Sequence, residues 1–75
     1  MPRLPVISGA QAVRIFERLG WHVDRQRGSH VILIKSGSSV SLSVPMHREL
    51  APGTLRAIIR IAGVTLQGFL QAYEQ

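Results

Sequence analysis

The residues best equipped for chemistry lie at positions 25–30, which read Arg-Gln-Arg-Gly-Ser-His. An imidazole titrates near neutral pH and can give or take a proton, and arginines bind phosphate oxygens through paired hydrogen bonds. Such a set could cleave an RNA phosphodiester. A base would take the proton of the 2′-hydroxyl, an acid would protonate the leaving oxygen, and arginine would offset the charge of the phosphorane. A turn that merely contains a histidine would carry the same residues, and this second interpretation stays open.

Other chemistries lack the residues they need. The sequence has no cysteine, no His-x-x-x-His pair and no cluster of carboxylates, so we expect no metal ion and no cofactor. Any nuclease activity is therefore expected to be independent of metal ions. Ser29 precedes His30 directly, and neighbours along a strand point to opposite faces, so we do not expect the two to act as a nucleophile and its base.

Positive charge is concentrated in the middle of the chain. The net charge is +5, and between residues 25 and 60 only Glu49 opposes the basic side chains. These are Arg25, Arg27, Lys35, Arg48, Arg56 and Arg60. A basic field of this kind favours a polyanion such as nucleic acid, an acidic protein or a membrane surface, although a surface that serves only solubility has a similar composition.

The length of 75 residues predicts a single domain over residues 1–75. A hydrophobic fraction of 45% suffices for one modest core but not for a deep enclosed pocket. The first residues lack the apolar run of a signal peptide, and nowhere do 18 apolar residues follow one another. We therefore expect a soluble, cytoplasmic protein without membrane contact.

Three helices are expected around the basic middle segment. Ser8 and Gln11 match a capping box, which predicts a helix that Gly20 ends. Pro52 suits the first turn of a second helix, which Gly63 closes. Thr65 would cap a short last helix that Gly68 weakens.

Three strands are expected between the first two helices. Residues 21–25 alternate with a period of two, residues 30–35 are apolar on both faces, and residues 40–44 alternate until Pro45. The prediction is an α+β fold in the order α-β-β-β-α, with a three-stranded antiparallel sheet, helices on one face and a short extra helix at the C-terminus.

The central strand has more apolar residues than one covered face needs. Either Val31 and Leu33 or Ile32 and Ile34 would form an uncovered apolar strip, because a register shift of one residue exchanges the faces. Such a strip beside basic residues suggests a protein partner. Alternatively, the last helix folds over it.

The sequence resembles the HicA-type toxins of bacterial toxin–antitoxin pairs over nearly its whole length. The resemblance rests on the first helix, with its Ser8 cap and its Leu-Gly end at 19–20, and on the Arg-Gln-Arg-Gly-Ser-His at residues 25–30. It rests also on the Val-Pro-Met-His at 44–47, on residues 53–60 and on the Ala-Gly at 62–63. Trp21 departs from it, where the family often has phenylalanine, and so does Gly68, in a helix whose start tends to be acidic in the family. Neither departure touches His30.

The resemblance implies a fold like that of double-stranded-RNA-binding domains and an mRNA interferase activity with His30 as the catalytic histidine. Gly28 would then let the turn approach a phosphate, with Ser29 beside it. His47 also matches a family position, without a firm role. The implied partners are mRNA and a HicB-type antitoxin that covers the site. Two alternatives of another class are a non-catalytic double-stranded-RNA-binding module and a protein that only binds other proteins.

Overall fold

Six elements follow one another in the computed structural model, which describes residues 3–75. They are α1 (Gly9–Arg18), β1 (His22–Arg27), β2 (His30–Ile34), β3 (Leu42–Pro45), α2 (Pro52–Ala62) and α3 (Leu66–Tyr73). The predicted α-β-β-β-α order with an extra short helix is confirmed.

The predicted helix ends are confirmed. The N–H of Gln11 donates to Ser8 Oγ at 3.1 Å, and the Gln11 side-chain oxygen accepts from the N–H of Ser8 at 2.8 Å, which completes the capping box of α1. Gly63 ends α2 with φ of 73°, a left-handed conformation that glycine adopts without strain. Thr65 caps α3 by accepting from the N–H of Gly68 at 3.0 Å.

The three strands form one antiparallel sheet in the order β1-β2-β3. The predicted strands exist, but their bounds shift: β1 extends to Arg27, β2 ends at Ile34 rather than Lys35, and β3 starts at Leu42. Pro45 is the last residue of β3 rather than the residue after it. A proline is tolerated there because β3 is an edge strand, whose outer side forms no ladder.

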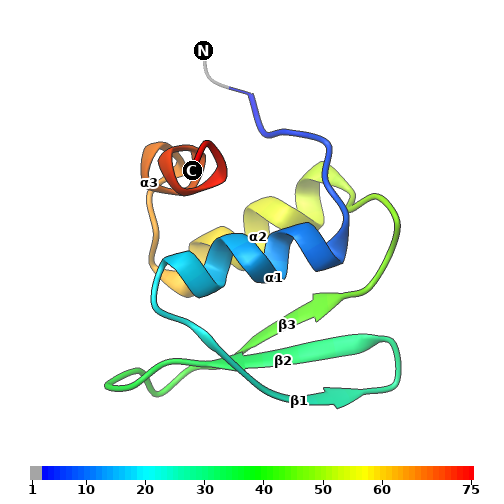
Figure 1. Ribbon diagram of the computed structural model, residues 1–75, viewed down its shortest axis with the longest axis vertical. Helices are drawn as coiled ribbons and strands as arrows, with labels where there is room; N and C mark the ends of the chain where they lie inside the picture. The colour runs from blue at the N-terminus through cyan, green and yellow to red at the C-terminus, as the bar shows by residue number, and fades with distance from the viewer. Residues whose placement is uncertain (1–2) are drawn as a thin grey trace.

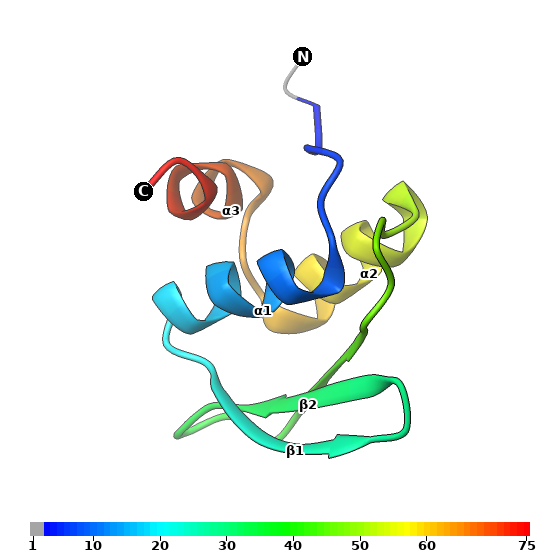
Figure 2. The ribbon, with the colours of Figure 1, turned by 45° about the vertical axis from the view of Figure 1, so that its right-hand side comes forward.

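The elements lie in three layers (Figure 1). The helices α1 and α2 cover one face of the sheet, and α3 packs on α1 on the side away from the sheet, as the turned view also shows (Figure 2). The rings of Phe16 in α1 and Phe69 in α3, both fully buried, lie 5.4 Å apart between their centroids. The last helix therefore does not fold over the opposite face of the sheet, and that alternative is wrong.

Burial settles which apolar pair of β2 is covered. Val31 and Leu33 face the helices and are 8% and 0% exposed, whereas Ile34 is 44% exposed and Ile32 is half-buried. All six residues of β1 are exposed. The sheet thus has an open face, which no helix covers, and the strip on it consists of Ile32 and Ile34. No helix within residues 3–75 has the length and apolar character to cross a membrane.

Candidate active site

A two-residue turn joins β1 to β2 at the predicted site. Gly28 has φ of 59°, and no residue other than glycine has a positive φ among the described residues, so Ser29 has a negative one. This combination fits a type II′ turn, the hairpin turn with glycine at its first central position. A side chain at Gly28 would meet nothing within 4 Å, so the space beside the turn is open. Ser29 lies in the turn, and β2 begins at His30, where the sequence analysis expects the second strand to start.

The two-residue turn sets the register of both arginines, and a β-bulge in β1 changes the register only beyond them. Val23 pairs with Leu33, but Arg25 pairs with Ile32, so Asp24 is an extra residue in the ladder. In a regular strand Val23 and Arg25 would share a face. Arg25 and Arg27 lie between the bulge and the turn, keep the register that the turn sets, and share the open face with Ile32 and His30. The bulge instead moves Val23 to the face of the helices, opposite Leu33.

His30 lies on the open face, directly opposite Arg27. These two residues pair across β1 and β2 next to the turn, and residues opposite each other in a ladder share a face. Both are exposed. Arg25 lies one step further along the same face, opposite Ile32, and His22 lies at the far end, opposite Ile34. One face of the hairpin therefore carries two guanidinium groups and two imidazoles, of which only that of His30 lies next to the turn.

Hydrogen bonds hold both carbonyl groups of the turn. The Gln26 side-chain amide donates to the carbonyl oxygen of Gly28 at 3.1 Å, and the N–H of Met46 donates to that of Ser29 at 2.7 Å. The N–H groups of Gly28 and Ser29 donate to no acceptor within residues 3–75. The turn thus presents two free backbone donors next to His30.

His47 lies two residues after the end of β3, next to Met46, whose N–H donates to the turn. Its carbonyl oxygen accepts from the N–H of Gly9 at 2.9 Å, so the start of α1 fixes the backbone at His47. Because Met46 bonds to Ser29, this backbone lies at the same end of the sheet as His30. The His47 side chain is exposed and makes no hydrogen bond to another described residue.

The arginines of the hairpin differ in their partners. A guanidinium nitrogen of Arg25 donates to the carboxylate of Asp24, its neighbour at the bulge. Arg27 has no carboxylate within ion-pair distance and makes no side-chain hydrogen bond in the described part of the chain. An exposed ion pair of this kind contributes little to stability, but it neutralises part of the charge of Arg25.

The other predicted basic residues lie outside the ladder that pairs Arg27 with His30. Lys35 follows the far end of β2, about 17 Å along an extended chain, and its ammonium lies 5.9 Å from the centroid of the Trp21 ring. Arg56 and Arg60 lie on the exposed side of α2, across the sheet from the open face. Arg48 is exposed in the loop between β3 and α2. Of the six, only Arg25 and Arg27 share the face of His30 in the ladder.

The family assignment comes from a comparison with protein-family models. Residues 9–64 match the model described as the HicA toxin of bacterial toxin–antitoxin systems. This match covers most of the chain and includes the hairpin, the loop with His47 and α2. The chain belongs to the HicA toxin family. It is thus the toxin of a toxin–antitoxin system, and an antitoxin is its expected partner. No curated protein matched the chain.

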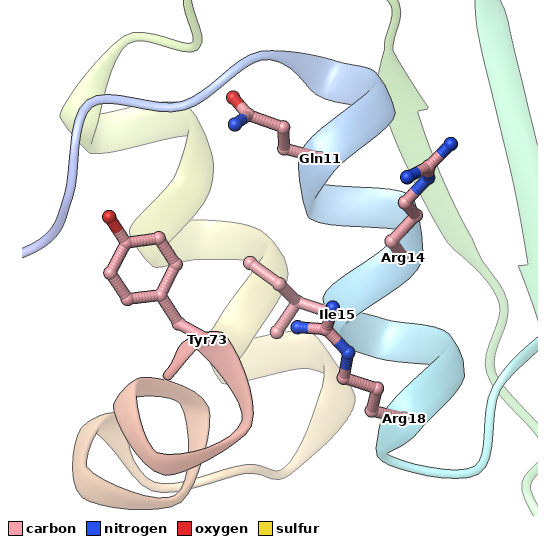
Figure 3. A pocket seen from close by; sticks show the side chains of 5 residues that line it. All are labelled: Gln11, Arg14, Ile15, Arg18 and Tyr73. Atoms are coloured by element: carbon pink, nitrogen blue, oxygen red, sulfur yellow. The ribbon is translucent and has the colours of Figure 1, made fainter. Parts of the chain in front are cut away.

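A pocket in this HicA toxin lies away from the hairpin. It has a volume of about 180 Å³ between α1 and α3 and is lined by Gln11, Arg14, Ile15, Arg18 and Tyr73 (Figure 3). It contains none of the predicted site residues, and α1 separates it from the sheet. The candidate site is instead an exposed surface. In residues 3–75 no group of three histidine, cysteine or acidic side chains is placed to hold a metal ion.

Sequence reasoning missed two contributors to the geometry of the HicA hairpin. Asp24 makes the bulge and partners Arg25, and Gln26 holds the turn. The bulge has no signal in a single sequence, because residues 21–25 alternate as a regular strand would. The role of Gln26 could have been suspected from its place two residues before a turn glycine, where its amide can reach the turn carbonyl.

Proposed function

We propose that this toxin is an endoribonuclease, an mRNA interferase, with His30 as general acid or general base. The observation that carries the proposal is the position of His30 on the uncovered face of the sheet, beside a glycine turn and opposite Arg27, which has no carboxylate partner within residues 3–75. A substrate as large as RNA can reach this surface without any opening of the fold. Membership of a toxin family supports the proposal because a ribonuclease would stop growth by destroying transcripts.

The proposed reaction needs only groups that the surface and the substrate supply. The 2′-oxygen of the RNA attacks the adjacent phosphorus while a base removes its proton, and the bond from phosphorus to the 5′-oxygen breaks as an acid protonates that oxygen. The products are a 2′,3′-cyclic phosphate and a 5′-hydroxyl. An imidazole can serve either proton transfer, each worth about 10² to 10⁴ in rate. His47, at the same end of the sheet, is a candidate for the other one.

The basic side chains are proposed to bind the RNA backbone. Arg25 and Arg27 lie beside His30, and Gly28 and Ser29 leave an open turn with free N–H groups for a phosphate. Lys35, Arg48, Arg56 and Arg60 are candidate contacts for more distant nucleotides. Their spread over two sides of the molecule favours a substrate longer than a dinucleotide.

The antitoxin is proposed to be a HicB-type protein that covers the open face. Ile32 and Ile34 form an apolar strip there, with Ile34 exposed and Ile32 half-buried in the free toxin. Burying Ile34 fully on binding would stabilise a complex, since apolar surface contributes about 25 cal/mol per Å². A partner on this strip would also cover His30, which stands on the same strand and face. Inhibition would then follow from occupation of the site.

The reaction is tested with RNA substrates in EDTA. The toxin should cut RNA and leave a 2′,3′-cyclic phosphate, and a substrate with 2′-deoxyribose throughout should bind without being cut. Cleavage of the deoxy substrate would contradict the proposed nucleophile. Salt-sensitive binding of duplex RNA without cleavage at any pH would replace the proposal by its alternative, a non-catalytic double-stranded-RNA-binding module.

A further inference from the structure

We propose that Arg27 is a second catalytic residue, which contacts the scissile phosphate and stabilises the phosphorane, whereas Arg25 contributes to RNA binding alone. This inference rests on the proposed ribonuclease activity and separates two arginines that the sequence leaves equivalent. Both lie on the open face of β1, two residues apart. Two observations distinguish them: their register against β2 and their ion-pair partners.

The register puts Arg27 within reach of the phosphate that His30 acts on. Residues directly opposite in an antiparallel ladder have Cβ atoms about 4.5 to 5.5 Å apart. A phosphate bound against the His30 imidazole is therefore accessible to the guanidinium of Arg27, with no rearrangement of the backbone. Arg25 stands opposite Ile32, two residues along β2 from His30, or about 7 Å further from the turn.

The two arginines differ in whether their charge is already paired with a carboxylate, and so in how readily they can bind a phosphate. The guanidinium of Arg25 is held by the carboxylate of Asp24, so binding a phosphate there requires the ion pair to loosen or to be shared. Arg27 forms no such pair among the described residues. Its donors are free to follow the phosphate as negative charge grows on its oxygens in the transition state, which is the property that distinguishes catalysis from binding.

The turn adds two backbone donors between Arg27 and His30 in the chain. Gly28 and Ser29 follow Arg27 directly, and their N–H groups have no acceptor within residues 3–75. Because nothing lies within 4 Å of the Cβ position of Gly28, a phosphate oxygen can approach this backbone closely. Arg27, the turn and His30 thus lie together at the end of the hairpin, and Arg25 lies two residues further along β1.

Three variants test the inference in steady-state cleavage of a single-site RNA. Arg27→Ala should lower kcat about 10²-fold or more, as loss of one preorganised donor to a developing oxyanion does. Arg27→Lys should restore part of kcat, because the ammonium keeps the charge but lacks the planar pair of donors. Arg25→Ala is the matched control, on the same strand and face; it should raise KM a few-fold with kcat within about twofold of the original toxin.

The outcomes separate this inference from the proposed function. If His30→Ala abolishes cleavage but Arg27→Ala changes only KM, like Arg25→Ala, then Arg27 is a binding residue and the inference is overturned. Equal losses of kcat in Arg25→Ala and Arg27→Ala overturn the distinction between them. A His30→Ala protein that cleaves normally removes the proposed site altogether. Both arginines are exposed, so their alanine variants should fold, and thermal unfolding checks this directly.

Discussion

At the scale of single residues, Gly28 has a conformation that other residues rarely adopt. Its φ of 59°, at the first central position of a type II′ turn, costs an L-residue about 1 to 3 kcal/mol, although a methyl group there would meet no neighbour. We predict that Gly28→Ala lowers the free energy of unfolding by about this amount and reduces RNA cleavage at least tenfold. The activity falls because the added methyl group blocks the approach of the phosphate to the turn.

Gly37 supplies the matched control for that prediction. It lies between β2 and β3, has φ of 84°, and also has open space at its Cβ position. Gly37→Ala should cost a similar free energy of unfolding but leave cleavage unchanged. Chemical denaturation and a cleavage assay on both variants make the comparison. Equal activities of the two folded variants would show that Gly28 serves the turn and not the substrate.

The identities of the candidate site residues were predictable from sequence, but their pairing was not. A histidine after two arginines and a turn glycine is visible in the chain, as is its place before an apolar strand. Which of the arginines faces His30 depends on the register, and which of them is neutralised depends on Asp24. The sequence left the register open because it did not fix which residues form the turn between β1 and β2. It left the ion pair open because the bulge at Asp24 has no local signal.

At the scale of secondary structure, helices were easier to predict than strands. Helix ends depend on local signals. Ser8 caps α1 and Thr65 caps α3, while Pro52 begins α2 and Gly63 ends it, and each acts within four residues along the chain. Strand bounds depend on partners far apart in sequence. Consequently β1 and β3 differ from their predicted ranges by one to two residues at each end, while the order of elements is as predicted.

The start of α1 positions the loop that carries His47. Gly9 bonds to the carbonyl of His47, and a Cβ at Gly9 would overlap the carbonyl oxygen of Pro45, which belongs to rigid backbone. We predict that Gly9→Ala lowers the free energy of unfolding by about 1 to 3 kcal/mol, the usual cost of overpacking. It should also shift the backbone NMR signals of residues 45–47.

Gly53 serves as the control for that substitution. It lies in the first turn of α2, where a Cβ would meet nothing within 4 Å. Because alanine is the better helix former by up to about 1 kcal/mol, Gly53→Ala should stabilise the protein slightly. If Gly9→Ala also proved stabilising, the tight contact between α1 and the end of β3 would be refuted.

At the scale of the whole molecule, one face of the sheet is covered by no helix of residues 3–75 and is accessible to other molecules. The helices bury Leu33 and Val44 completely, and α3 adds a third layer behind them rather than a cover on the opposite side. Both proposed ligands therefore compete for the same surface. RNA would use the basic and imidazole side chains near the turn, and the antitoxin would add the apolar strip of Ile32 and Ile34.

The proposed antitoxin contact predicts a selective loss of affinity. Ile34→Asn should weaken binding of the HicB-type partner about tenfold or more, because it removes an apolar contact and buries an amide without a partner. Ile61→Asn is the control, since Ile61 is similarly exposed, at 54%, but lies on α2. Isothermal titration calorimetry measures the affinity of both variants for the HicB-type partner. A larger loss for Ile61 would place the partner on the helical side.

The cleavage assay of His30→Ala against His22→Ala tests the central claim most directly. Both histidines lie on the open face of the hairpin and are exposed, about 14 Å apart along the sheet. In EDTA, with folding checked by circular dichroism, His30→Ala should bind RNA as the original toxin does and cut none, while His22→Ala cuts normally. Full cleavage by a folded His30→Ala protein would contradict the account, because no other imidazole lies opposite Arg27.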